Sequence, residues 1–378
     1  MSDNIDLGKK LEAEFENLKR EVQKPNILIA GGTGVGKSSI INLIFGEEMA
    51  NVGVGRPVTK HLDVFESENS DVRIYDSKGY EIKKNGDEDF FNKVVELPKV
   101  TGKPEDAVHL IWYCISTTSG RVTEYDLNAI ERFSNSNIPV AVLMTKTDKA
   151  SEEDIVALKN VVSQSFANIP IFETSIYMPM YNHTDELIDW SINNLAAPLR
   201  MAFIKSQKSD LKAKWKKAHI MIAEHAAGAF AVGFTPIPMS DAPILVANEL
   251  GLLARILYLY DLGSLNDTLK QAGLGAALTG LLSAGGKAAV GALLKVIPVV
   301  GWAVGGAISG GVGAAITFAF GEATSAVGYE VGKARLSGNT ALADDMIANL
   351  GKIIVDEATK AIKSGKKDKN DYSFDDLD

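Results

Sequence analysis

The stretch GGTGVGKS, from Gly31 to Ser38, decides the fold expected for this chain of 378 residues. It fits the pattern G-x-x-x-x-G-K-[ST], and it lies between an apolar run at 26–30 that predicts a strand and a segment that predicts a helix. Glycines let successive backbone N–H groups surround phosphate oxygens, and the helix N-terminus adds favourable partial charge. The residues expected to hold a nucleotide here are Gly31, Gly32, Thr33, Gly34, Val35, Gly36, Lys37, Ser38 and Ser39.

Short apolar runs alternate with helical periods on the C-terminal side of this loop. The runs occupy residues 71–76, 107–115, 139–144 and 169–175. Strands that alternate with helices predict βαβ units, and hence an α/β domain with a mostly parallel sheet covered by helices on both faces. Residues 61–67 precede the run at 71–76 closely and predict an antiparallel edge strand in a hairpin.

Three further motifs follow predicted strands. DSKG places Asp76 where it can hold Mg²⁺ through water, and it places the Gly79 N–H where it can meet a γ-phosphate. In TKTD, which starts at Thr145, Asp148 can accept hydrogen bonds from guanine N1–H and its exocyclic amine, and the Lys146 stem can lie across the base. Ser175, in ETSI, can meet the guanine O6 through its hydroxyl or backbone N–H.

These motifs, in this order, resemble the P-loop GTPases, specifically the Era-like and septin/dynamin-like branch of the translation-factor-related class. The resemblance covers about residues 25–200. It implies GTP and GDP as ligands, Mg²⁺ as cofactor and GTP hydrolysis as the activity. Ser38, Asp76 and Thr59 would hold the metal, with Thr59 completing its shell when the γ-phosphate is bound. Lys37 and Thr59 are the expected catalytic residues.

The chain departs from this family at three positions. Tyr80 stands where many members have Gln to orient the attacking water, so we expect slow intrinsic hydrolysis. Gly34 replaces the Asn that some members link to potassium activation, and Thr145 replaces the usual Asn of the guanine motif. Arg121 is either a surface arginine or an arginine finger, acting in cis or across a homodimer formed through the GTPase domain.

Composition excludes several other classes. Apolar residues make up 46% and charged residues 23%, which is typical of a folded chain. The single cysteine rules out a disulfide framework and a Cys-based zinc site. The net charge of −9 predicts no nucleic-acid partner, and the first residues do not form a secretory signal, which favours a cytoplasmic location.

Outside the GTPase domain, expected at 25–203, the sequence predicts helices. Residues 1–24 contain an amphipathic helix, and residues 365–378 form a charged tail expected to be disordered. Residues 204–364 are rich in Ala and Gly and predict an all-α domain with two apolar hairpins, bent at Pro236/Pro238 and at Pro298. It begins with a basic amphipathic helix at 205–217, and it loosely resembles a helical domain of unknown function that is often fused to bacterial Era-like domains.

The role of the apolar half stays open. Residues 296–321 carry no charge and are long enough to span a bilayer as a helix. One interpretation is a GTP-controlled switch whose hairpins associate with membrane lipid. The alternatives are a soluble regulatory GTPase whose helical domain binds a protein partner or a ribosome, and a membrane-perturbing effector that the GTPase domain holds in check.

Overall fold

The architecture is taken from a computed structural model. It describes residues 2–46, 56–59, 62–66, 71–77, 91, 94–177, 183–232, 242–262, 312–350, 352–354 and 356–357. Contacts divide the chain into two compact units, Val22–Asp210 and Met1–Glu21 with Leu211–Asp378. The sequence analysis placed these boundaries at 24/25 and 203/204. The second hairpin, the bends at Pro236/Pro238 and the tail at 365–378 lie outside the described residues.

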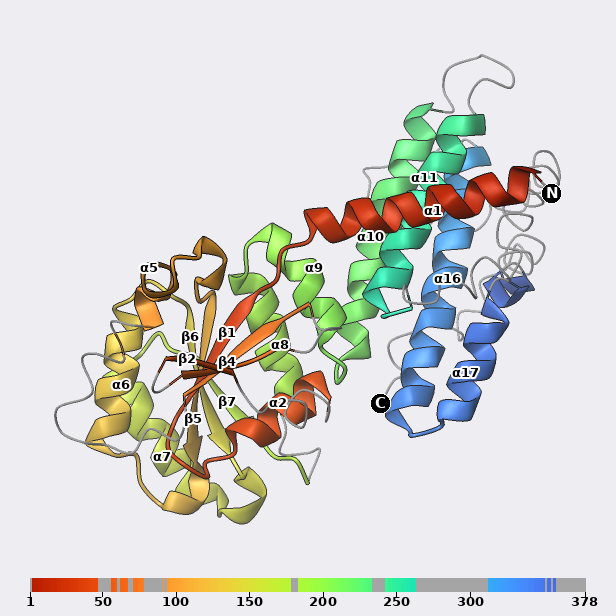
Figure 1. Ribbon diagram of the computed structural model, residues 1–378. Coiled ribbons are helices and arrows are strands. Elements are labelled where there is room, and N and C mark those ends of the chain that lie inside the picture. Colours follow the sequence, from red (N-terminus) through yellow and green to blue (C-terminus); the bar gives the residue numbers. More distant parts are fainter. Residues whose placement is uncertain are drawn as a thin grey trace. The chain divides into compact units, whose positions relative to one another are not determined.

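The first unit is built on a seven-stranded sheet with the strand order β2-β3-β4-β1-β5-β6-β7 (Figure 1). Neighbouring strands from β4 to β7 pair in parallel, and β2 and β3 pair antiparallel at one edge. The strands are β1 (Asn26–Ala30), β2 (Arg56–Thr59), β3 (Leu62–Phe65), β4 (Arg73–Ser77), β5 (Leu110–Ser116), β6 (Val140–Thr145) and β7 (Ile171–Thr174). The expected α/β fold is confirmed.

The sequence analysis missed one strand. The antiparallel strand expected at 61–67 corresponds to β3, but it is not the edge strand, because Arg56–Thr59 forms β2 on its outer side. The segment is short and contains Pro57, which cannot donate a backbone hydrogen bond. An edge strand tolerates proline, because one side of it has no ladder partner.

Helices cover both faces of the sheet. One face packs against α5 (Leu97–Thr101), α6 (Glu124–Ser134) and α7 (Glu152–Ser165) through a core that contains Phe133, Leu158 and Val162. On the other face, Phe45 of α2 (Lys37–Phe45) stacks on Trp112 of β5. The indole of Trp112 meets α9 (Ala197–Ser206) through Phe203, and it donates a hydrogen bond to a serine of α8 (Thr184–Asn194).

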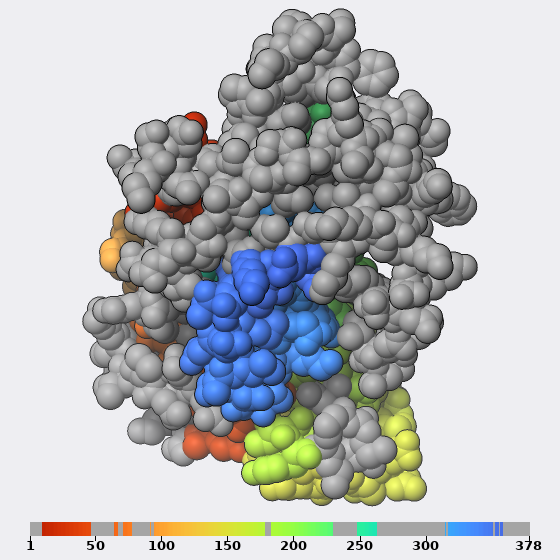
Figure 2. All heavy atoms as spheres, turned by 90° about the vertical axis from the view of Figure 1, so that its right-hand side faces the viewer, coloured from red at the N-terminus to blue at the C-terminus, as the bar shows by residue number. Residues whose placement is uncertain are grey.

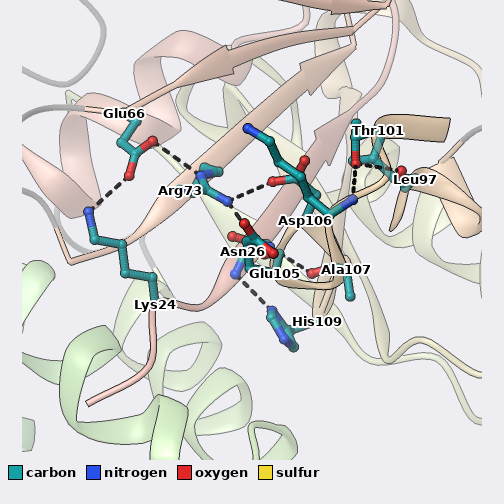
Figure 3. A network of polar contacts seen from close by, with 11 residues as sticks. Lys24, Asn26, Glu66, Arg73, Leu97, Thr101, Glu105, Asp106, Ala107 and His109 are labelled. Atoms are coloured by element: carbon teal, nitrogen blue, oxygen red, sulfur yellow. Dashed lines mark hydrogen bonds and ion pairs between the residues drawn. The ribbon is translucent and has the colours of Figure 1, made fainter. Parts of the chain in front are cut away.

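A polar network joins the amino ends of β1, β4 and β5 (Figure 3). The Arg73 guanidinium pairs with Asp106 at 2.9 Å and with Glu66 at 3.2 Å. The Asn26 N–H donates to Nδ1 of His109 over 2.9 Å, and burial lowers the pKa of this imidazole. The network therefore sets the register of three strands at the edge of the sheet opposite the GGTGVGKS loop, which follows the carboxyl end of β1.

The described part of the second unit is helical. It comprises α1 (Ser2–Glu21), α10 (Leu211–Val232), α11 (Ala242–Leu259), α16 (Val312–Leu336) and α17 (Thr340–Ala348). The expected apolar stripe of α1 is buried at Leu11, Phe15 and Leu18, and α1 lies against α11 (Figure 1). The N-terminal helix thus belongs to the same unit as the C-terminal helices. Atoms of α16 and α17 lie on the surface seen in Figure 2.

Glycines let α16 pack closely against its neighbours. A Cβ placed at Gly328 would lie 2.5 Å from the Tyr260 ring, and one at Gly321 would lie 2.6 Å from Ile222. Both distances are shorter than real carbon contacts allow. The Ala/Gly-rich composition therefore serves close helix packing in the described part of this unit. Among the described residues, no helix is long and apolar enough to cross a membrane.

The basic helix expected at 205–217 is not continuous. Helix α9 ends at Ser206 and α10 begins at Leu211. The Gln207 side chain holds the intervening turn, because its Nε2 donates to Asp210 O and its Oε1 accepts from Asp210 N. Of the lysines in this segment, Lys214 is only 4% exposed.

Candidate functional site

The GGTGVGKS loop runs from the end of β1 to the start of α2. Its backbone is left-handed at Gly31, Gly34 and Gly36, with φ values of 134°, 72° and 111°. A Cβ at Gly31 would lie 2.3 Å from the carbonyl oxygen of Cys114 in β5. Only glycine fits there, because the loop crosses the neighbouring strand at this point. The Cys114 thiol itself is buried, which raises its pKa to about 12.

Lys37 is buried at the first position of α2. Its ammonium donates to the carbonyls of Gly31 and Gly32 at 3.2 and 3.1 Å, and it lies 3.9 Å from a carboxylate oxygen of Asp76. Asp76 reaches this position because β4 pairs with β1 and sets Asp76 beside Ile29. The sheet thus brings together the lysine and the aspartate that the sequence analysis assigned to phosphate and metal.

The guanine motif lies at the ends of β6 and β7. Lys146 has a left-handed backbone, with φ 59°, and its ammonium donates to Gly34 O at 2.6 Å. Asp148, in the short 3₁₀ helix η3 (Thr147–Lys149), accepts a hydrogen bond of 2.8 Å from the Ser175 hydroxyl. Three of the expected base-binding residues therefore lie beside the phosphate loop or one another.

Thr145 joins this motif to the phosphate loop. Its hydroxyl lies 2.5 Å from Val35 O and 3.3 Å from Ile115 O, and its side chain is buried. Threonine has one hydroxyl proton and can donate it to one carbonyl at a time. Thr145, which replaces the usual Asn, therefore links β6 to the phosphate loop through the carbonyl of Val35.

Three buried hydroxyls of the site escaped the sequence analysis. Thr117 donates to carbonyls of the guanine motif, Thr147 donates to Thr174 O at 3.2 Å, and Thr174 donates to Met144 O at 3.2 Å. Each residue lies at or just beyond the carboxyl end of a parallel strand. That position was the only available signal, since threonine is also common inside strands.

The remaining expected residues are placed in part. Thr59 is the last residue of β2, and its side chain lies outside the description. Gly79 and Tyr80 also lie outside the described residues. Arg121 is exposed between β5 and α6. Within the described ranges, no group of three or more His, Cys, Asp or Glu side chains could hold a metal ion.

The donors that are described suit Mg²⁺ nevertheless. Asp76 offers a carboxylate that is 14% exposed, and Ser38 offers an exposed hydroxyl in the first turn of α2. Oxygen ligands of this kind, completed by water and nucleotide phosphates, are what Mg²⁺ prefers. Such a site needs few protein ligands, so it does not require a larger acidic cluster.

Comparison with known proteins supports the interpretation of the first unit as a GTPase domain. A family model described as "50S ribosome-binding GTPase" matches residues 26–146. The probable GTP-binding protein EngB of Aquifex aeolicus is 29% identical over 138 residues, which cover 36% of this chain and 74% of the relative. The protein of the same name from the Wolbachia strain wRi is 26% identical over 169 residues, covering 43% of this chain and 83% of the relative.

Solved structures give matches of low overall similarity. Aquifex aeolicus Era bound to GDP·AlF4⁻ has 20% sequence identity and a TM-score of 0.33, covering 58% of this chain and 71% of that chain. A probable GTP-binding protein engB has 17% identity and a TM-score of 0.31, covering 44% and 96%.

The family match and the motifs agree on one conclusion. The first unit of this chain is a P-loop GTPase domain, the kind of domain that binds and hydrolyses GTP. The family match ends at residue 146, within this unit. The resemblance noted for residues 204–364, and the finer placement in the Era-like and septin/dynamin-like branch, therefore stay predictions.

Proposed function

We propose that this protein is a nucleotide-dependent switch. It binds GTP with Mg²⁺, hydrolyses it to GDP, and changes the state of its helical unit according to the nucleotide. The observation that carries the proposal is that the phosphate loop, the Lys37–Asp76 pair and the guanine motif meet at the carboxyl ends of the parallel strands of one sheet. Ligands of such sheets bind at these ends.

The phosphate loop supplies the electrostatic part of the reaction. Its left-handed glycines turn backbone N–H groups toward the phosphates, and the Lys37 ammonium, placed at the start of α2, neutralises the β- and γ-phosphate oxygens. Lys37 already lies across the loop between two of its carbonyls, so the ammonium moves little to meet the phosphates. This arrangement stabilises the charge that develops as the γ-phosphate leaves.

Ser38, Asp76 and Thr59 would hold the metal. When bound, Mg²⁺ neutralises phosphate charge and fixes the phosphate geometry. Asp76 also lies near Lys37, so its negative charge balances the lysine when no nucleotide is present. Gly79 lies three residues beyond Asp76, and its N–H would donate a hydrogen bond to the γ-phosphate that is lost on hydrolysis.

Asp148, Lys146 and Ser175 would select guanine. The Asp148 carboxylate accepts from the N1–H and amino groups of guanine, a donor pair that adenine does not offer. The Ser175 hydroxyl, which donates to this carboxylate, fixes its rotamer. The Lys146 ammonium is held by Gly34 O, so its stem is placed to cover one face of the base.

The hydrolysis rate would be slow without a partner. Tyr80 cannot orient the attacking water as the amide of Gln does, and the phenol differs from it in reach and geometry. Arg121 is exposed, so a second copy of the chain could bring it to a phosphate across a homodimer. An Arg121→Ala variant whose GTPase rate still rises with protein concentration, as in the parent, would exclude that role.

Two substitutions test the site. Lys37→Ala should reduce GTP affinity by at least about tenfold, because a charge-assisted contact to phosphate is lost. Lys103→Ala, which alters an exposed lysine of the same unit, is the matched control. Asp148→Asn should shift preference from GTP toward the xanthine nucleotide, whose C2 carbonyl matches the new amide. Unchanged affinity in the first variant, or unchanged base preference in the second, contradicts the assignment.

The output of the helical unit has two candidates. The uncharged residues 296–321 favour association with membrane lipid, although most of this segment lies outside the described residues. The description of the matched family favours a ribosomal partner. Flotation with anionic vesicles and co-sedimentation with ribosomes, each with GDP and with a non-hydrolysable GTP analogue, separate the two. Nucleotide-independent results in both assays contradict a switch.

A further inference from the structure

We propose that Thr117 is a positioning residue for guanine recognition. Its hydroxyl holds the backbone of the guanine motif in the turn that presents Asp148 to the base. The inference rests on the proposed function, and it adds a residue that touches no nucleotide in the assigned site. Thr117 acts on the base only through the chain that carries Lys146 and Asp148.

The contacts of Thr117 span two strands. The residue follows β5 directly, opens the 3₁₀ helix η2 (Thr117–Ser119) and is 2% exposed. Its Oγ1 lies 2.8 Å from Lys146 O and 3.0 Å from Thr145 O. It reaches both carbonyls because β5 and β6 pair in parallel, with Ser116 opposite Thr145. The one proton of this buried hydroxyl can therefore be donated to either of the two carbonyls where β6 turns toward the base.

The backbone of that turn has an unfavourable conformation at Lys146, so contacts from outside the turn help to stabilise it. Lys146 has φ 59°, a backbone conformation that residues with a Cβ adopt rarely. Its carbonyl also accepts from Lys149 N at 3.0 Å, a bond within the turn itself. The Thr117 hydroxyl is the contact that fixes this carbonyl to the neighbouring strand. Without it, the turn is tied to the sheet less directly.

The turn decides where the base contacts lie. Lys146 precedes Asp148 by two residues, so a rotation at Lys146 moves the carboxylate away from its position against Ser175. The same rotation draws the Lys146 ammonium from Gly34 O. Thr117 therefore links the order of the guanine motif to the order of the phosphate loop, although it lies in neither.

A purely structural role for Thr117 gives a different result from a positioning role. Thr117→Val removes the hydroxyl and keeps the shape, and Thr117→Ser keeps the hydroxyl and removes a methyl group. GDP and IDP differ only in the 2-amino group, which Asp148 would bind, so the ratio of their affinities reports where the carboxylate lies. A structural role lowers the melting temperature and leaves this ratio unchanged.

The experiment measures the dissociation constants of GDP and IDP by calorimetry on the full chain with Mg²⁺. For Thr117→Val we expect GDP affinity to fall about tenfold and IDP affinity to fall less, so that the GDP/IDP ratio drops at least about threefold. Thr117→Ser should keep the parent ratio within about twofold. Thr118→Val, which alters the exposed neighbouring threonine, is the control and should match the parent.

Equal losses for GDP and IDP in Thr117→Val, or an unchanged ratio, overturn the positioning role and leave the proposed function intact. A parent chain that binds neither nucleotide overturns the proposed function itself. If Thr117→Val does not fold, Thr117→Ala removes the same hydroxyl without filling its space, and its ratio decides the question by the same criterion.

Discussion

Replacement of Glu249 by Gln should remove a pH dependence from the helical unit. Glu249 lies in α11, is 1% exposed, and accepts a hydrogen bond from the Thr317 hydroxyl of α16. Its second carboxyl oxygen has no hydrogen-bond partner among the described residues. Burial raises the pKa of this carboxyl from 4.5 to about 7, and the Thr317 bond opposes the rise only in part. The helical unit is therefore most stable when the Glu249 carboxyl is protonated.

The size of the effect follows from linkage. The folded carboxyl keeps its proton up to about pH 7, and the unfolded one loses it near 4.5. Stability is complete below the lower value and falls as the pH rises through the upper one. Each pH unit between them is worth about 1.4 kcal/mol, so the unit loses about 3 kcal/mol between pH 4.5 and pH 7. The neutral Glu249→Gln variant, which can still accept from Thr317, should keep that stability at pH 8.

Hydrogen exchange resolved by peptide provides the assay, because it reports the opening of α11 and α16 separately from the GTPase unit. Exchange is measured at pH 5 and pH 8 and corrected for its intrinsic pH dependence. We expect the parent helices to open more easily at pH 8 by about 3 kcal/mol, and the variant to show no such change. Glu330→Gln, at an exposed site of α16, is the control and should behave as the parent.

His225 contributes to the pH dependence of this unit with the opposite sign. Burial lowers the pKa of its imidazole, so it reduces stability as the pH falls. The difference between parent and Glu249→Gln cancels this contribution. A parent and a variant with the same pH profile would refute the reasoning, since Glu249 would then not be the group that titrates.

Three further predictions concern other sites. Gly328→Ala should destabilise the helical unit by about 1–3 kcal/mol in denaturant unfolding, because its Cβ would lie 2.5 Å from Tyr260, whereas Gly228→Ala on α10 should not. Gly31→Ala should abolish GDP binding in calorimetry, since it combines a φ of 134° with a Cβ 2.3 Å from a carbonyl oxygen. The melting temperature of the GTPase unit should fall as the pH drops below about 6.5, because burial lowers the pKa of His109 and its neutral ring accepts a hydrogen bond from Asn26 N–H. His109→Gln should make the melting temperature less dependent on pH in this range.

Local patterns predicted most of the GTPase unit. Short segments are enough to predict the phosphate loop, the alternation of strands and helices, and the order of the motifs. The reason is that glycine positions and the periodicity of apolar side chains depend on the local backbone conformation. The same reasoning failed where a local pattern was ambiguous. Arg56–Thr59 is too short and too polar to indicate a strand, and the amphipathic pattern of residues 205–217 does not reveal the turn that Gln207 imposes.

The sequence by itself determined the α/β fold of the first unit, and it predicted a phosphate-binding loop and a guanine motif, since those features depend on neighbours in the chain. Only the tertiary structure decided what the hydroxyls and buried charges contact. Thr117 meets Lys146 O across 29 residues, Thr145 meets Val35 O across 110, and Glu249 meets Thr317 across 68. Such contacts arise when strands pair and helices pack, and no periodicity in the sequence encodes which distant side chain fills the space beside a buried polar group.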